Sequence, residues 1–310
     1  MDSTMNHPLA SGSFDPFKDV NFSALEKSLR HPRTFFSVFM SGLVTLMTLL
    51  ALIPLISVVG MLVWRGGQRL GTALFTQLPP APLESGGGFG NAIMGTLIII
   101  TIATLISVPL GLLSAIYLAQ TTTTNKLAHA VRFAAKILTG FPSILAGVFA
   151  YGTVVLLTGG FSAIAGGVAI SILMLPTIML TAEDAIRMVP AKMKEAAIGM
   201  GTTPTQTVWM VLLPTALPGI LTGIMLAIAR GVGETAPLLF TALFSNYWAL
   251  QEGRLDLMQP TASLAVLIYN FSGMPFQNQL ELAWAAALVL VLLVLTTNLI
   301  GQSLSHRQIQ

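Results

Sequence analysis

Six apolar runs dominate this 310-residue sequence, and each approaches or exceeds the length needed to cross a lipid bilayer. A membrane-spanning α-helix needs about 20 predominantly apolar residues. Hydrophobic residues make up 54% of the chain and charged residues 9%, which lies outside the range of ordinary soluble domains. The sequence therefore predicts an all-α membrane protein with six transmembrane helices, at about 34–64, 91–119, 137–158, 161–181, 207–230 and 282–303.

The segments between the spans are polar or rich in turn-forming residues. Residues 1–33 lack the apolar core of a signal peptide, so we expect a short polar tail before a transmembrane domain at 34–310. Prolines and glycines crowded into 79–88 predict a loop without regular structure. Residues 121–136 form a polar connection, and Gly159-Gly160 predicts a hairpin between the third and fourth spans.

The fifth apolar segment is too long for one span. A helix over residues 208–244 would be roughly 55 Å long, against a hydrocarbon core of ~30 Å. We expect a break at the glycines and proline within 231–237, followed by outer-face structure over 240–281. Within it, 263–269 is apolar but too short to span, which predicts a re-entrant or interfacial segment.

Lysine and arginine are concentrated on the predicted side of the membrane that carries both termini. Cytoplasmic loops are enriched in these residues, so the bias predicts cytoplasmic termini and a cytoplasmic loop at 183–206. The basic residues assigned to this side are Lys18, Lys27, Arg30, Arg33, Lys126, Arg132, Lys136, Arg187, Lys192, Lys194 and Arg307, whereas Arg65, Arg69, Arg230 and Arg254 fall on the other.

The loop at 183–206 predicts two short helices joined by a tight turn. Pro190 suits a first helical position, and Gly201 suits the end of the helix. Thr203 and Gln206 form a capping-box pattern, with Pro204 between them at the start of a second helix. From residue types alone, an ordinary amphipathic loop remains the alternative.

A longer pattern in this region resembles the EAA loop of ABC-importer permeases. It comprises Glu195-Ala196-Ala197, Gly201, Val211 and Leu213-Pro214, with Val211 at a position where Ile is commoner. The resemblance implies a MetI-like type I importer fold, in which a coupling helix docks into a groove of a separate ATP-binding subunit. Glu195, Ala196, Ala197 and Gly201 are then the coupling residues.

Arg230 and Glu234 are charged residues at the end of the fifth span, four positions apart. Arg230 either extends to the outer interface or faces a cavity with Glu234 as its partner, because intramembrane ionisable residues usually mark a substrate route. Arg187 follows Glu183 and Asp184, and we interpret it as an interfacial anchor or a partner of those acids.

The segment 229–239, ARGVGETAPLL, looks like that of PstA-type permeases of phosphate importers. Residues 90–96, 141–144 and 260–270 are likewise similar to this family, so the resemblance extends from about Gly90 to the last span. It implies that Arg230, Glu234 and Thr235 line a phosphate pathway. A PstC-type permease or a permease for another oxyanion is the alternative.

The same resemblance implies partners and a location. The expected partners are a homologous PstC-type permease, two copies of an ATP-binding subunit, an extracytoplasmic phosphate-binding protein and membrane lipid. The expected location is the bacterial plasma (inner) membrane, with several spans. Gly219 and Gly223 present a small-residue face that packs either within the chain or against the partner permease.

Several other function classes lack their sequence signatures. The chain has no G-x-x-x-x-G-K-[ST] loop for binding a nucleotide. We therefore predict that it is not an enzyme and binds no cofactor, and that the partner subunit hydrolyses ATP. The GVGETA segment at 231–236 matches a dinucleotide motif by letter but has no surrounding βαβ unit. No internal repeat favours a secondary transporter, and a net charge of +3 does not indicate nucleic acid.

Overall fold

The computed structural model describes residues 32–121, 124–251 and 253–306, so the predicted polar tail lies almost wholly outside the described residues. The chain divides into two units, Met1–Val58 and Val59–Gln310. In the first unit the described residues belong to one apolar helix, α1 (Pro32–Met61). The last turn of α1 already belongs to the second unit, and a π-helical turn, η2 (Leu62–Gly66), follows it. Thr34–Gly66 is long and apolar enough to cross a membrane.

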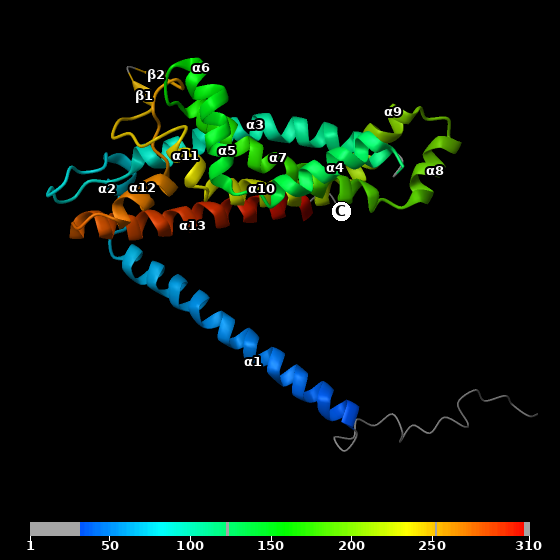
Figure 1. Cartoon of the computed structure of the whole chain (residues 1–310), viewed down its shortest axis with the longest axis horizontal. Helices are drawn as coiled ribbons and strands as arrows, with labels where there is room; N and C mark the ends of the chain where they lie inside the picture. The colour runs from blue at the N-terminus through cyan, green and yellow to red at the C-terminus, as the bar shows by residue number, and fades with distance from the viewer. Residues whose placement is uncertain (1–31, 122–123, 252, 307–310) are drawn as a thin grey trace, which may run out of the picture. The chain divides into compact units, whose positions relative to one another are not determined.

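Four long helices form the body of the second unit. These are α3 (Gly90–Gln120), α7 (Ala163–Arg187), α10 (Leu213–Val232) and α13 (Gln277–His306), which run side by side (Figure 1). Helix α7 packs between α3 and α10, and α10 also packs against α13. With α1, these helices give five candidate spans among the described residues, which confirms the all-α membrane fold class.

Small residues bring α7 and α10 close together. A methyl group added at Gly223 would lie 2.1 Å from the Thr181 hydroxyl, and one added at Gly219 would lie 2.8 Å from Ala185. The small-residue face predicted for the fifth span therefore packs within the chain. Helix α10 ends at Val232, which confirms the break predicted at the glycines that follow.

The segment predicted as a polar connection and a third span consists of two helices bent by 107°, which give a sixth candidate span if the pair crosses the membrane as one broken span. Helix α4 (Lys126–Thr139) precedes the bend, and α5 (Ser143–Ala150), η3 (Tyr151–Val155) and α6 (Leu156–Thr158) follow it. The predicted start of the span at 137 thus belongs to α4. The cause is local, because Pro142 disfavours a helical conformation at Phe141 and ends the α4 hydrogen bonds.

The two ends of the second unit carry different short elements (Figure 1). At one end, called the α8 end, lie α8 (Ala191–Gly199), α9 (Pro204–Thr207) and η4 (Val208–Leu212). At the other, the α12 end, lie α2 (Ala73–Thr76), α12 (Leu264–Ser272) and a two-stranded hairpin of β1 (Leu250–Gln251) and β2 (Arg254–Leu255). Helix α2 is one turn of regular structure shortly before the proline-rich loop.

Helix α12 occupies the segment predicted as re-entrant or interfacial, and its first turn is buried in the protein. Leu264, Val266 and Leu267 have no exposed surface, and the helix packs against α3 and α13. The Leu264 N–H donates to the Thr96 hydroxyl of α3 at 2.9 Å, and the Asn91 amide donates to the Ser245 carbonyl at 2.8 Å. Polar groups of α3 thus hold the 240–264 segment in place.

Candidate functional site

The first candidate site is the α8–α9 turn. Gly201 adopts φ +88°, a left-handed conformation that strains any residue with a side chain, and this confirms the predicted tight turn. Thr203 and Gln206 form both hydrogen bonds of the predicted capping box, with Pro204 at the first helical position. Sequence alone therefore predicted the geometry of this turn correctly.

The start of α8 is one residue later than predicted. Pro190 has φ −57° and ψ 131°, so it is the capping residue and the helix begins at Ala191. The proline ring fixes only φ, and that value suits both a capping residue and a first helical residue. The value of ψ, which separates the two, follows from the bend between α7 and α8.

The four predicted coupling residues differ in exposure. Glu195, Ala196 and Gly201 are exposed, whereas Ala197 is buried and its carbonyl accepts the Thr202 N–H at 3.2 Å. Ala197 therefore faces the interior of the protein and links α8 to the turn that follows it, whereas Glu195, Ala196 and Gly201 face outward. Large apolar side chains are exposed around them, namely Met193, Ile198, Met200, Trp209 and Met210. An apolar surface of this kind, rich in methionine, is typical of a protein-binding site.

The second candidate site is the Arg230–Glu234 pair at the opposite end of α10. The Arg230 Nε lies 3.5 Å from the Glu234 Oε1, although the helix itself ends between the two residues. The Glu234 side chain is 16% exposed and the Arg230 side chain 38% exposed. The carboxylate is thus largely enclosed, whereas the guanidinium is accessible from one side.

Close packing fixes the backbone around this pair. A methyl group on Gly231 would lie 2.9 Å from both Ile100 of α3 and Ile170 of α7, so a larger residue there would force these side chains to move. After the turn, Thr235 is the N-terminal capping residue of α11 (Ala236–Leu239), and Pro237 lies against Gly147 of α5. The predicted residues Arg230, Glu234 and Thr235 therefore lie on one rigidly held turn between three helices.

A third charged cluster was only partly predicted. The Glu183 Oε1 accepts hydrogen bonds from the Arg187 Nε at 2.8 Å, as predicted for a partner of that acid, and from the Arg132 Nε at 2.7 Å. Both guanidiniums also donate to the Leu118 carbonyl near the end of α3, at 3.1 and 2.7 Å. The Glu183 side chain is only 5% exposed, so this cluster binds α3, α4 and α7 together at the α8 end. The sequence feature that indicates this cluster is Glu183, an acidic residue late in an apolar helix. Its partner Arg132 is 51 residues away in the sequence.

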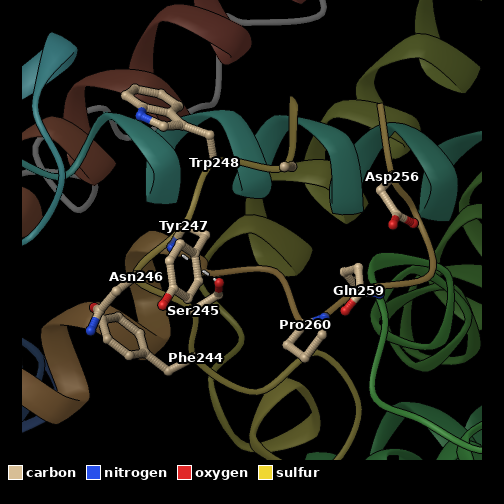
Figure 2. A pocket seen from close by; sticks show the side chains of 9 residues that line it. Phe244, Ser245, Asn246, Tyr247, Trp248, Asp256, Gln259 and Pro260 are labelled. Atoms are coloured by element: carbon tan, nitrogen blue, oxygen red, sulfur yellow. Dashed lines mark hydrogen bonds between the residues drawn. The ribbon is translucent and has the colours of Figure 1, made fainter. Parts of the chain in front are cut away.

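A cavity of about 420 Å³ lies at the α12 end, in the segment between α11 and α12 (Figure 2). Its lining includes Ser245, Asn246, Tyr247, Asp256 and Gln259, and it has no basic side chain. The lining offers hydrogen-bonding groups and one carboxylate. Such a surface does not favour an anion.

A family model described as the binding-protein-dependent transport system inner membrane component matches residues 107–310, which is more than half of the chain. The chain belongs to this family. Its apolar helices and its family together make it a multi-pass membrane permease subunit of an importer.

Several relatives cover most of the chain. A protein of Yersinia pestis named phosphate transport system permease protein PstA is 41% identical over 240 residues, covering 77% of this chain and 80% of the relative. A protein of the same name from Xylella fastidiosa strain 9a5c is 40% identical over 247 residues, covering 79% of this chain and 84% of the relative. Both identities are high enough to assign the chain to the PstA family.

Solved structures support the fold. A chain of the inward-facing MetNI methionine ABC transporter matches with a TM-score of 0.55 at 23% identity, covering 70% of this chain and 93% of that chain. A chain of a bacterial alginate ABC transporter, solved with its periplasmic protein, matches with a TM-score of 0.60 at 15% identity, covering 91% and 98%. The predicted MetI-like fold of ABC-importer permeases is confirmed.

Proposed function

We propose that this chain is a permease subunit of an ATP-driven phosphate importer and forms half of its membrane pathway. The observation that carries the proposal is the identity of about 40% to PstA proteins over more than three quarters of the chain. That likeness favours PstA-type phosphate transport over a PstC-type partner or a permease for another oxyanion.

The proposed assembly contains a PstC-type permease, two copies of an ATP-binding subunit and an extracytoplasmic phosphate-binding protein. The α8 end faces the cytoplasm in this proposal, in line with the lysines and arginines around it. The exposed residues Glu195, Ala196 and Gly201, with the methionines beside them, form the surface that docks on the ATP-binding subunit. Ala197 supports that surface from inside.

Arg230, Glu234 and Thr235 line the phosphate pathway in this proposal. A guanidinium donates paired hydrogen bonds to an oxyanion, and Arg230 is accessible on one side. A partly exposed ion pair contributes only about 0.2–1 kcal/mol, so a passing phosphate can replace Glu234 as the partner of Arg230. Glu234 then recovers the guanidinium and favours release of the anion.

The test uses the whole importer in proteoliposomes, with uptake of labelled phosphate and sulfate measured during ATP hydrolysis. We expect selective phosphate uptake, and a decrease of at least tenfold for Arg230→Ala and Glu234→Ala. Arg254→Ala is the matched control, because Arg254 is an exposed arginine on β2 at the same end. Equal uptake of sulfate would remove the substrate assignment, and unchanged phosphate uptake by Arg230→Ala would remove the pathway role.

A further inference from the structure

A second cavity, of about 460 Å³, lies between α4 and α7 at the α8 end. Arg230 does not line it, since Arg230 lies at the opposite end of α10. Its ionisable lining residues are His129, Arg132, Lys136, Glu183, Asp184 and Arg187. We call it the α4–α7 cavity. It contains the Glu183 cluster but extends beyond it to side chains that have no part in that cluster.

The two arginines of the cavity are held in fixed positions. Each guanidinium donates through Nε to Glu183 and through Nη2 to the Leu118 carbonyl, with donor–acceptor distances of 2.7 to 3.1 Å. A guanidinium has five N–H groups, so these two bonds leave three on each arginine for another acceptor. The Glu183 carboxylate and the Leu118 carbonyl already hold both guanidiniums in place. The two arginines therefore lose little side-chain entropy when an anion binds.

Lys136 adds a cationic group to the same wall. It lies four residues after Arg132 on α4, so both project from one face of the helix, and His129 lies one turn earlier on that face. No ion pair of Lys136 occurs among residues 32–121, 124–251 and 253–306. Three cationic side chains thus face two carboxylates, and one of those, Glu183, is already engaged by two arginines.

Exposed apolar side chains flank the basic residues of α4. Leu127, Phe133 and Ile137 each expose at least half of their surface. A helix that combines basic residues with exposed apolar ones is typical of an element at the level of lipid headgroups. The α4–α7 cavity is therefore open to anions from two sources, the aqueous phase and the membrane.

We propose that the α4–α7 cavity binds a phosphate-type oxyanion, either free inorganic phosphate or the phosphodiester of an anionic phospholipid. Lys136, Arg132 and Arg187 supply the hydrogen bonds, and Glu183 acts as the internal strut that orients both arginines. Asp184 also lines the cavity and limits affinity. Binding of free phosphate rests on the proposed function, since the anion is then the transported substrate as it leaves the permease. Binding of a lipid headgroup does not rest on it.

The test uses the full chain carrying Arg230→Ala, so that the proposed pathway residue does not contribute to binding. The protein is placed in nanodiscs of phosphatidylcholine, and [32P]phosphate binding is measured by equilibrium dialysis. We expect Lys136→Ala to weaken binding on the order of tenfold, because it removes one charge-assisted hydrogen bond. Lys126→Ala is the matched control, because Lys126 lies on the same helix but does not line this cavity.

A parallel arm identifies a lipid ligand. The same variants are placed in nanodiscs that contain phosphatidylglycerol, and lipid retained by the protein is measured by native mass spectrometry. Retention by the parent and by Lys126→Ala, but not by Lys136→Ala, supports the headgroup as the ligand, whereas Lys136-dependent phosphate binding supports the free anion. If neither ligand binds, or if binding is independent of Lys136, the inference is overturned.

These outcomes separate the inference from the proposed function. An importer that transports phosphate, in which neither ligand shows Lys136-dependent binding, refutes only the α4–α7 site. A chain that binds an oxyanion here, in an importer that does not transport phosphate, refutes only the proposed function.

Discussion

A single substitution, Gly201→Ala, tests both the backbone strain of the left-handed turn and the role of that turn in coupling ATP hydrolysis to transport. A Cβ atom at Gly201 meets nothing within 4 Å, and the same is true at Gly199 two residues earlier. The two glycines differ in conformation, because Gly201 has φ +88° and Gly199 is the last residue of α8. Gly201→Ala and Gly199→Ala therefore form a matched pair in which steric clashes are absent from both.

We expect Gly201→Ala to destabilise the turn by about 1–2 kcal/mol, the cost of a left-handed conformation for a residue with a Cβ atom. Gly199→Ala should be neutral or stabilising by up to about 1 kcal/mol, because alanine is the better helix former. A loss of 1–2 kcal/mol corresponds to a factor of about 5–30 in the population of the closed turn. The Thr202 N–H, which donates to the Ala197 carbonyl at 3.2 Å, reports that population.

The assay combines hydrogen exchange of the Thr202 amide with ATP-driven phosphate uptake by the assembled importer. We expect about 5–30-fold faster exchange and reduced uptake for Gly201→Ala, and wild-type values for Gly199→Ala. Equal exchange in both variants would refute the strain argument. Faster exchange with normal uptake would show that the turn does not transmit the ATP-driven motion.

Two further substitutions test the packing of the chain by its thermal unfolding in detergent. Glu183→Gln should lower the free energy of unfolding by about 3 kcal/mol, because it removes the buried carboxylate that both Arg132 and Arg187 contact, whereas Asp184→Asn at the exposed neighbouring position should change it by less than about 0.5 kcal/mol. Gly95→Ala should destabilise by about 1–3 kcal/mol, because the added methyl would lie 1.9 Å from the Ala262 carbonyl oxygen, and Gly152→Ala should be tolerated because its methyl meets nothing within 4 Å. Equal unfolding midpoints within either pair would contradict the corresponding contact.

Features encoded by neighbouring residues were predictable from the sequence. The capping box at Thr203 and Gln206, the turn at Gly201 and the end of α10 before Gly233 each depend on a few adjacent positions. Their residue types restrict the backbone directly, through side-chain hydrogen bonds or through the absence of a Cβ atom. The ion pair of Arg230 and Glu234 belongs to the same group, since four positions separate the two residues.

Features that depend on distant segments were not predictable. Arg132 lies beside Glu183 only because α4 folds back after α3, an arrangement that joins residues 51 positions apart. Ala197 looked equivalent to Ala196 because both are small helix formers, yet only Ala197 faces its own chain. Burial of this kind is set by tertiary packing, which a single sequence does not display.

The hydrogen bonds between α3 and the α12 end also set an order for biosynthesis. Asn91 finds its acceptor 154 residues later at Ser245, and Thr96 meets the Leu264 N–H 168 residues later. A ribosome makes α3 long before either partner, so the nascent helix carries an amide without that acceptor, and a buried unsatisfied polar group costs about 1–3 kcal/mol. A chain that terminates before residue 245 never forms these hydrogen bonds. The same contacts that close the finished protein are therefore missing from an incomplete one.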